Sequence, residues 1–107
     1  MAFTRYHNIA GTSAVTTKLI SRGSNANSIK SIVITNTRAS NGATVDLFLQ
    51  DSTGSVVKNF SILKNSEIPA NFSLILDNES MVSFDNDVYD LFITVGSSDT
   101  LDVLINT

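Results

Sequence analysis

The sequence contains no cysteine and no tryptophan, and it has only one proline and one histidine. Without cysteine, neither a disulfide framework nor a thiolate metal site can hold the fold together, so side-chain packing must do so. His7 has no cysteine to pair with, and no Gly-x-Ser-x-Gly motif is present to activate a hydroxyl. We therefore expect a protein that is not an enzyme, with no catalytic residue, no cofactor and no metal.

Clusters of basic residues and long hydrophobic runs are also missing. Charged residues make up 16% of the chain, the net charge is −3, and the seven Lys and Arg residues are scattered singly. This distribution does not attract a phosphate backbone, so we expect no nucleic-acid partner. No apolar run approaches the roughly 18 residues that span a bilayer, so we expect no membrane partner. With 42% hydrophobic residues among 107, the chain is apolar enough to fold around one core.

The dominant pattern is an alternation of apolar and polar residues with a period of two, which is typical of strands. It runs through residues 31–35, 45–50, 72–76, 89–95 and 101–105, with weaker candidates at 15–20, 56–63 and 81–84. Clusters of Gly, Asn, Asp and Ser separate these segments. Asp51-Ser-Thr-Gly54 predicts a hairpin, because Asp can bond its own backbone to start the turn and Gly54 tolerates a positive φ at its end. The sequence predicts an all-β protein, a single antiparallel β-sandwich of about eight short strands, jelly-roll or immunoglobulin-like, over residues 12–107.

Residues 1–11 lie outside this alternation. Phe3 and Tyr6 make the segment too apolar for a purely solvated tail. We predict an N-terminal arm over residues 1–11 that contacts a neighbouring subunit or another protein through these two side chains.

The alternation divides the strand residues between a core face and an outer face. The predicted core consists of Ile32, Ile34, Val45, Leu47, Leu49, Leu74, Leu91, Ile93 and Val103. Five further apolar residues have the opposite phase, namely Val33, Phe48, Ile75, Phe92 and Leu104. Either strand bulges turn some of these five inward, or they cover an interface, since a solvated antiparallel sheet does not need them. We predict an interface that includes these five residues, with Phe48 and Phe92 at its centre because a monomer would leave both rings in water.

Two other kinds of site have weaker support. Acidic residues are frequent between positions 77 and 90, and their oxygens would suit Ca²⁺, but they lack the spacing and closing Glu of a helix-loop-helix calcium site. Solvated turn residues are the simpler interpretation. A carbohydrate-binding platform would need exposed aromatic residues, whereas most aromatic residues here fit strand positions.

Five segments follow one another along the chain: Ala26-Asn-Ser-Ile-Lys-Ser-Ile-Val-Ile-Thr-Asn-Thr, Ala43-Thr-Val-Asp-Leu-Phe-Leu, Ile68-Pro-Ala, Phe72-Ser-Leu-Ile-Leu and Leu101-Asp-Val-Leu-Ile. In this order they resemble segments of small structural proteins of tailed bacteriophages. The composition, poor in Cys and rich in Asn and Ser, is similar to that of marine and cyanobacterial phage proteins. The chain departs from the family at Asn71, where Gly often follows Ile-Pro-Ala, so Asn71 would have to adopt the strained turn conformation.

The resemblance implies a non-enzymatic virion protein of the neck, tail or capsid surface, made in the host cytoplasm. It implies a homo-oligomer that also binds other virion proteins, and it transfers no catalytic residue. The alternative function is a carbohydrate- or receptor-binding β-sandwich module of a tail fibre, which would use exposed aromatic residues or a calcium-bound loop.

Overall fold

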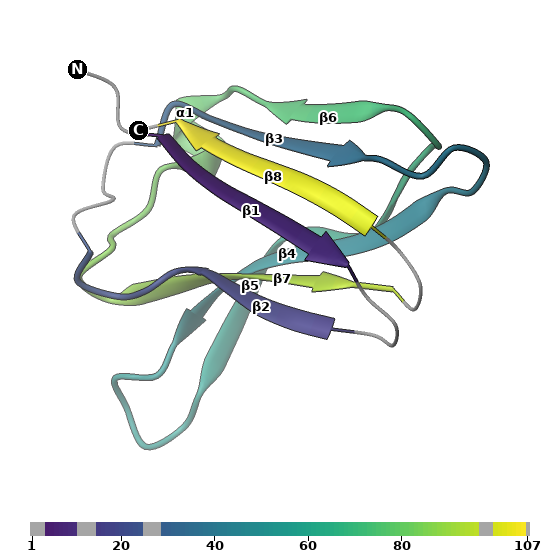
Figure 1. Cartoon of the computed structure of the whole chain (residues 1–107). Helices are drawn as coiled ribbons and strands as arrows, with labels where there is room; N and C mark the ends of the chain where they lie inside the picture. Colours follow the sequence, from purple (N-terminus) through teal and green to yellow (C-terminus); the bar gives the residue numbers. More distant parts are fainter. Residues whose placement is uncertain (1–3, 11–14, 25–28, 97–99, 107) are drawn as a thin grey trace.

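The chain folds into eight strands and one short helix in a computed structural model that describes residues 4–10, 15–24, 29–96 and 100–106 (Figure 1). The elements are β1 (Thr4–Ala10), β2 (Val15–Ile20), β3 (Ser31–Asn36), β4 (Ala43–Asp51), β5 (Lys58–Ile68), β6 (Ser73–Leu76), α1 (Glu79–Val82), β7 (Tyr89–Val95) and β8 (Thr100–Asn106). The predicted all-β class is confirmed. Among the described residues, no helix has the length and apolar character that crossing a membrane would require.

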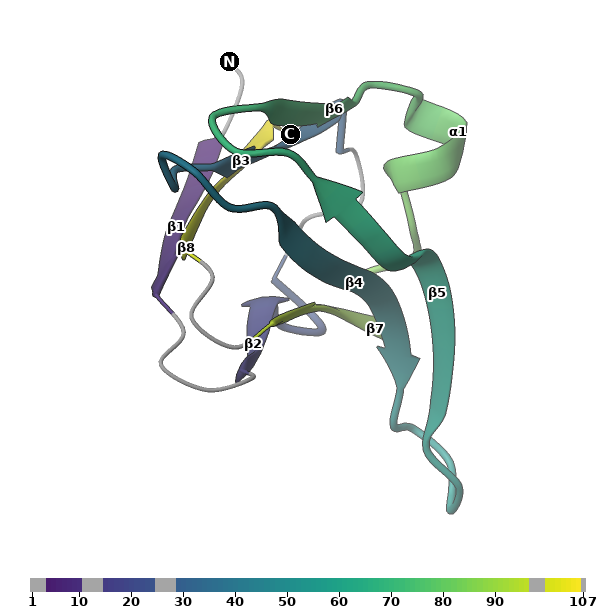
Figure 2. The same ribbon diagram turned by 90° about the vertical axis from the view of Figure 1, so that its right-hand side faces the viewer.

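The strands form two antiparallel four-stranded sheets, in the orders β1-β8-β3-β6 and β2-β7-β4-β5. Figures 1 and 2 show these sheets as two facing layers. Strand β1 pairs with β8, β2 with β7, β3 with β6, and β4 with β5, so the first half of the chain pairs with the second half in reverse order. A long hairpin rolled up in this way is a jelly roll, which decides between the two predicted topologies.

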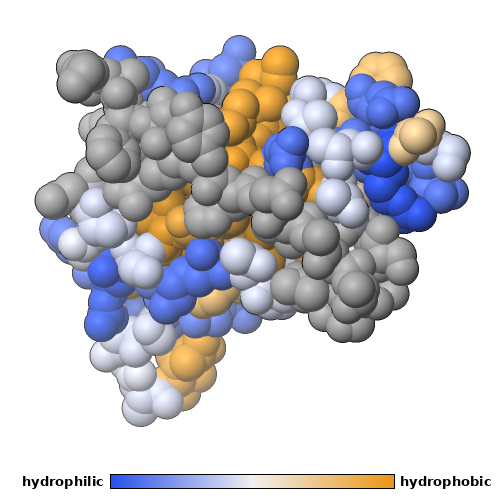
Figure 3. Space-filling view, in the orientation of Figure 1, coloured by the Kyte–Doolittle hydropathy of each residue, from blue (hydrophilic) through white to orange (hydrophobic). Residues whose placement is uncertain are grey.

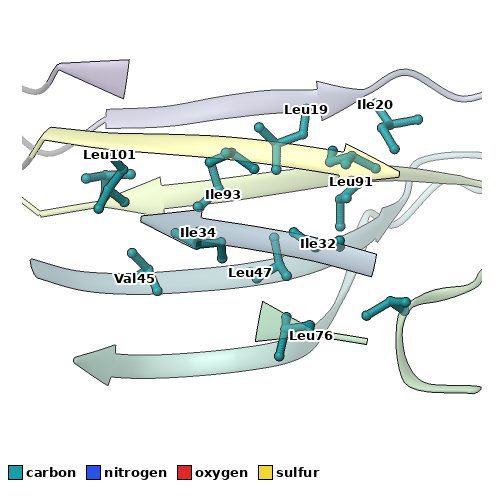
Figure 4. Packing of buried hydrophobic residues seen from close by; sticks show 14 of the residues in the cluster. Leu19, Ile20, Ile32, Ile34, Val45, Leu47, Leu76, Leu91, Ile93 and Leu101 are labelled. Carbon is teal, nitrogen blue, oxygen red and sulfur yellow. The ribbon is translucent and has the colours of Figure 1, made fainter. Parts of the chain in front are cut away.

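The core lies between the two sheets and is built from aliphatic side chains. Strand β3 alternates strictly between partly buried and buried residues, and β8 does the same. Figure 4 shows side chains such as Ile32, Leu47 and Ile93 between the strands of the two layers. Seven of the nine predicted core residues are buried, while Leu49 and Leu74 are partly buried and pack against the cluster. The predicted core face is therefore correct.

The N-terminal segment is a strand and not an arm over its described part. Residues 4–10 form β1, which pairs with β8 from Thr4 opposite Asn106 to Ala10 opposite Thr100. The prediction of an arm over residues 1–11 is wrong for this stretch. Its alternate residues include Arg5 and His7 on one side of the alternation and Asn8 on the other, so neither set is uniformly apolar. Backbone pairing with β8, which the apolar pattern does not reveal, makes this segment a strand.

The predicted strand at residues 81–84 is also wrong, because α1 occupies Glu79–Val82. Asn78 caps this single turn, and its side-chain oxygen accepts hydrogen bonds from the Ser80 backbone nitrogen at 3.1 Å and the Ser80 hydroxyl at 2.6 Å. An Asn that satisfies a free N–H favours the start of a helix. Val82 is buried on the turn, Met81 is exposed, and Phe84 after the turn is partly buried and packs against the core. The short apolar pattern therefore arises from a helical turn and the residue that follows it.

The hairpin predicted at Asp51-Ser-Thr-Gly54 joins β4 to β5. The Asp51 carboxylate accepts hydrogen bonds from the Thr53 hydroxyl at 2.5 Å and the Thr53 backbone N–H at 2.9 Å, and these bonds to its ionised form lower the pKa of Asp51. Gly54 does not use its tolerance of a positive φ, since among the described glycines only Gly23 has one, at 78°. The Asp51 side chain starts the turn as predicted.

Asn71 has a φ of 62°, so it adopts the left-handed conformation that its place after Ile68-Pro-Ala requires. A Cβ-branched residue is strained there, and we expect Asn71→Val to lower the free energy of unfolding by roughly 1–2 kcal/mol. Asn71→Gly should stay within about 0.5 kcal/mol of the wild type, since Gly accepts this φ. Urea unfolding measures both values. Asn59→Val, at an exposed strand position, is the control, and equal losses for Asn71→Val and Asn71→Gly would contradict the strain argument.

Candidate subunit interface

Three of the outward apolar residues form a continuous line across the β1-β8-β3-β6 sheet. Val33 of β3 lies directly opposite Ile75 of β6 on one side and Leu104 of β8 on the other. Directly opposed residues in antiparallel strands share a face, and their Cβ atoms lie about 4.5–5.5 Å apart. We call these three residues the transverse stripe. Ile75 is 58% exposed, and Val33 and Leu104 are each partly exposed.

Polar side chains border the transverse stripe on both sides. Thr35 and Ser73 face each other, and their hydroxyl oxygens are hydrogen-bonded at 2.7 Å. On the other side, the Asn106 amide donates to the Ser31 hydroxyl at 2.8 Å. These neutral pairs satisfy one another within the sheet. Asp102 of β8 lies opposite Thr35 and adds a carboxylate to this border. The stripe is therefore an apolar band with a polar border, which resembles the apolar centre and polar rim of protein interfaces.

Phe48 and Phe92 form a separate pair on the outer face of the β2-β7-β4-β5 sheet. They lie opposite each other in the register, and their rings stack with centroids 5.4 Å apart and planes 9° apart. The Lys18 ammonium lies 5.5 Å from the centroid of Phe92 and 3.9 Å from an Asp90 carboxylate oxygen. Both rings are partly buried, so the expectation that a monomer leaves them in water is wrong. Stacking and the cation above Phe92 stabilise them within one subunit.

The five outward residues are thus brought together in two groups, one on each outer face. Register shifts occur in the β2–β7 and β4–β5 pairs, but the β3–β6, β3–β8 and β4–β7 pairs are regular. The strands that carry the five residues therefore keep their alternation at these positions. Bulges do not turn the five residues inward. An interface that used all five would need partners on both faces.

The remaining predicted interface residues belong to the N-terminal segment. Tyr6 lies opposite Leu104 in the β1–β8 register, which places its backbone in line with the transverse stripe. Phe3 lies outside the described residues. The part these two residues play in an interface stays a prediction.

The hairpin between β4 and β5 carries a further apolar group that the strand pattern did not single out. Figures 1 and 2 show this hairpin projecting beyond the rest of the sandwich. Val56 is 67% exposed, Val57 55% and Phe60 49%, although the Phe60 ring meets Tyr89 edge-on at 6.0 Å. The consecutive valines after the turn were visible in the sequence. Their exposure was not, because it results from the extension of β4 and β5 past the opposite sheet.

Figure 3 shows hydrophobic residues at the surface over the β1-β8-β3-β6 sheet and on the projecting hairpin, among other places. Phe72, just before β6, is 62% exposed and lies one residue outside that strand. Within the described ranges, no group of three or more acidic or histidine side chains is arranged to hold a metal ion.

Comparisons with known proteins give a structural likeness but no sequence relative. No protein-family model matches the chain, and no curated protein sequence matches it. Among solved structures, the chain is similar to a chain in a structure of infectious bursal disease virus, Gx strain, with a TM-score of 0.49 and 12% identity. The match covers 97% of this chain and 33% of the viral chain, so this chain spans about a third of that chain's length.

Proposed function

We propose that this protein is a non-enzymatic structural component of a virus particle that acts by binding copies of itself and other virion proteins. The transverse stripe is the observation that carries this proposal. An outward sheet face exposed to water does not need an aliphatic line across adjacent strands, and Ile75 at its end remains 58% exposed. Covering such a line removes apolar surface from water, which favours association.

The topology is compatible with this role but does not decide it. Double-sheet jelly rolls occur in viral capsid proteins, and also in lectin domains and cupins. A fold of this kind hosts unrelated functions, so the argument depends on the surface. Within viruses, the sequence segments that resemble tailed-phage proteins favour a neck, tail or capsid-surface component, produced in the host cytoplasm and incorporated into the virion.

A carbohydrate- or receptor-binding module of a tail fibre is the second candidate. The exposed rings of Phe60 and Phe72 are the observation that favours it, since aromatic faces can stack on sugar rings. The two candidates differ in what covers the surface. An assembly protein buries aliphatic residues against protein, whereas a sugar site requires polar groups around an aromatic platform.

Disruption of the transverse stripe should dissociate the assembly. We expect the wild-type protein to form an oligomer whose mass light scattering measures, and we expect Ile75→Glu to shift it to the monomer, because a charge at an apolar contact is desolvated without a partner. Ile75 is exposed in the subunit, so this variant should fold and keep its β-sheet circular dichroism spectrum. Phe48→Ser with Phe92→Ser tests the opposite face in the same way.

The matched control is Val57→Glu, which places the same charge at an exposed apolar residue away from both sheet faces. Retention of the assembled mass by both the Ile75 variant and the double Phe variant would contradict the predicted interfaces. A wild type that stays monomeric alone and in the presence of virion proteins would contradict the proposed function. A monomer whose melting temperature rises with a sugar would support the second candidate.

A further inference from the structure

The loop that joins β3 to β4 presents the only Asn-Gly pair of the sequence, Asn41-Gly42. Both residues are exposed, and they lie between the end of β3 at Asn36 and the start of β4 at Ala43. Because Gly42 has no side chain, its backbone nitrogen is open to approach from the preceding residue. An exposed loop also allows the Asn side chain to rotate toward that nitrogen. The pair therefore has the chemistry for an intramolecular reaction.

We propose that Asn41 is a site of spontaneous deamidation and isomerisation. The Gly42 backbone nitrogen gives up its proton to solvent base and forms a bond to Cγ of Asn41, while the bond from Cγ to the side-chain nitrogen breaks and ammonia leaves. Water then opens the resulting succinimide at either carbonyl, giving aspartate or isoaspartate. One water molecule is consumed and one ammonia is released, and no oxidant or reductant takes part.

The main-chain oxygen of Asn41 has a structural role that isomerisation would end. The buried Asn36 side chain donates hydrogen bonds through Nδ2 to the backbone oxygens of Asn41, at 2.9 Å, and Ile68, at 3.0 Å. Its Oδ1 accepts from the Arg38 backbone nitrogen at 3.0 Å. Asn36 thus links the β3–β4 loop to the end of β5. In isoaspartate, the chain runs through the former side chain, and the old main-chain carbonyl becomes a free carboxylate. Asn36 keeps its bond to the Arg38 nitrogen but no longer holds the main chain at position 41.

The Glu67 carboxylate near the loop is a second reason why deamidation should destabilise it. Glu67 lies against Gly42, since a Cβ built on this glycine would be 3.1 Å from Glu67 Oε1. Both products add a negative charge at position 41, one residue before the glycine that this carboxylate lies against, and like charges repel. Isoaspartate combines the repulsion with the loss of the main-chain contact, whereas ordinary aspartate introduces the repulsion alone. The two products should therefore differ in stability.

Incubation of the full chain in mildly alkaline buffer, followed by peptide mapping, tests the reaction. We expect the mass change of amide loss to accumulate at Asn41 ahead of other exposed asparagines such as Asn59. Asn41→Gln keeps an amide but needs a larger ring, and its rate should be lower by about tenfold or more, the factor that an added barrier of about 1.4 kcal/mol produces. Gly42→Ala is a poorer control because its Cβ would crowd Glu67. Equal rates at Asn41 and Asn59 would overturn the proposal.

Comparing the isoaspartyl form with Asn41→Asp tests whether isomerisation weakens the loop. Asn41→Asp carries the charge of the products on an ordinary main chain, and the isoaspartyl form can be separated from the incubated wild type by chromatography. We expect the isoaspartyl form to melt at a lower temperature than Asn41→Asp, because only the former loses the link between Asn36 and the main chain at position 41. Equal melting temperatures would show that this contact does not hold the loop, and would overturn that part of the proposal.

Discussion

Replacing Ile93 by Ala is expected to lower the free energy of unfolding by about 2–5 kcal/mol, because the change removes buried methyl groups and leaves a cavity. Ile93 is fully buried at the middle of β7 and lies opposite Leu47 of β4, which is equally buried. Strand β7 has neighbours on both sides, β2 and β4, so its backbone has little freedom to collapse into the cavity. Leu47→Ala should have an effect of similar size.

Urea unfolding followed by circular dichroism measures this loss, which is large for a domain whose total stability is typically about 5–15 kcal/mol. Ile75→Ala is the matched control. It removes the same atoms from a residue that is 58% exposed on the outer face, and we expect a loss below about 1 kcal/mol for the isolated subunit. Similar losses at Ile93 and Ile75 would show that the two faces had been assigned incorrectly.

Replacing Asn36 by Ala is expected to destabilise the protein through unsatisfied polar groups and not through lost apolar contacts. The Asn36 side chain is fully buried and serves three backbone partners, namely the oxygens of Asn41 and Ile68 and the nitrogen of Arg38. Each partner left without a hydrogen bond in a buried place costs about 1–3 kcal/mol, and water can reach those near the exposed loop. We therefore expect a total loss of about 2–4 kcal/mol, dominated by the Ile68 oxygen.

The control is Asn59→Ala on the exposed part of β5, where the lost partner is the Gln50 side-chain amide at 3.1 Å. Water replaces this bond, so the change should stay within about 0.5 kcal/mol. Asn36→Asp adds a second comparison, because it keeps the acceptor for Arg38 and loses both donors. If Asn36→Asp were as stable as the wild type, the donated bonds to Asn41 and Ile68 would not stabilise the fold.

The transverse stripe and the hairpin show how far residue patterns predict a surface. Val33, Ile75 and Leu104 could be assigned to an outer face from the alternation alone, since a strand turns successive side chains to opposite faces. That they lie in one line depends on the registers of β3 with β6 and β8, which no local pattern specifies. The stacking of Phe48 on Phe92 likewise depends on the pairing of β4 with β7.

Two segments differ from the prediction for different reasons. The segment at residues 4–10 lacks apolar alternation, and it becomes β1 because β8, far away in the chain, offers it a free edge. The apolar residues near Met81 suggested a strand, but the local Asn78 cap and the burial of Val82 give a helical turn.

The sequence by itself determined the β class, the absence of disulfide support, the core face of most strands and the need for Asn71 to take a left-handed conformation. These properties follow from side-chain polarity and local sterics, which each segment carries with it. Only the tertiary structure decided the jelly-roll pairing, the separation of the outward residues onto two faces, the exposure of the projecting hairpin and the burial of Asn36. These depend on contacts between segments distant in the chain, and many pairings satisfy the same alternation until the whole sandwich selects one.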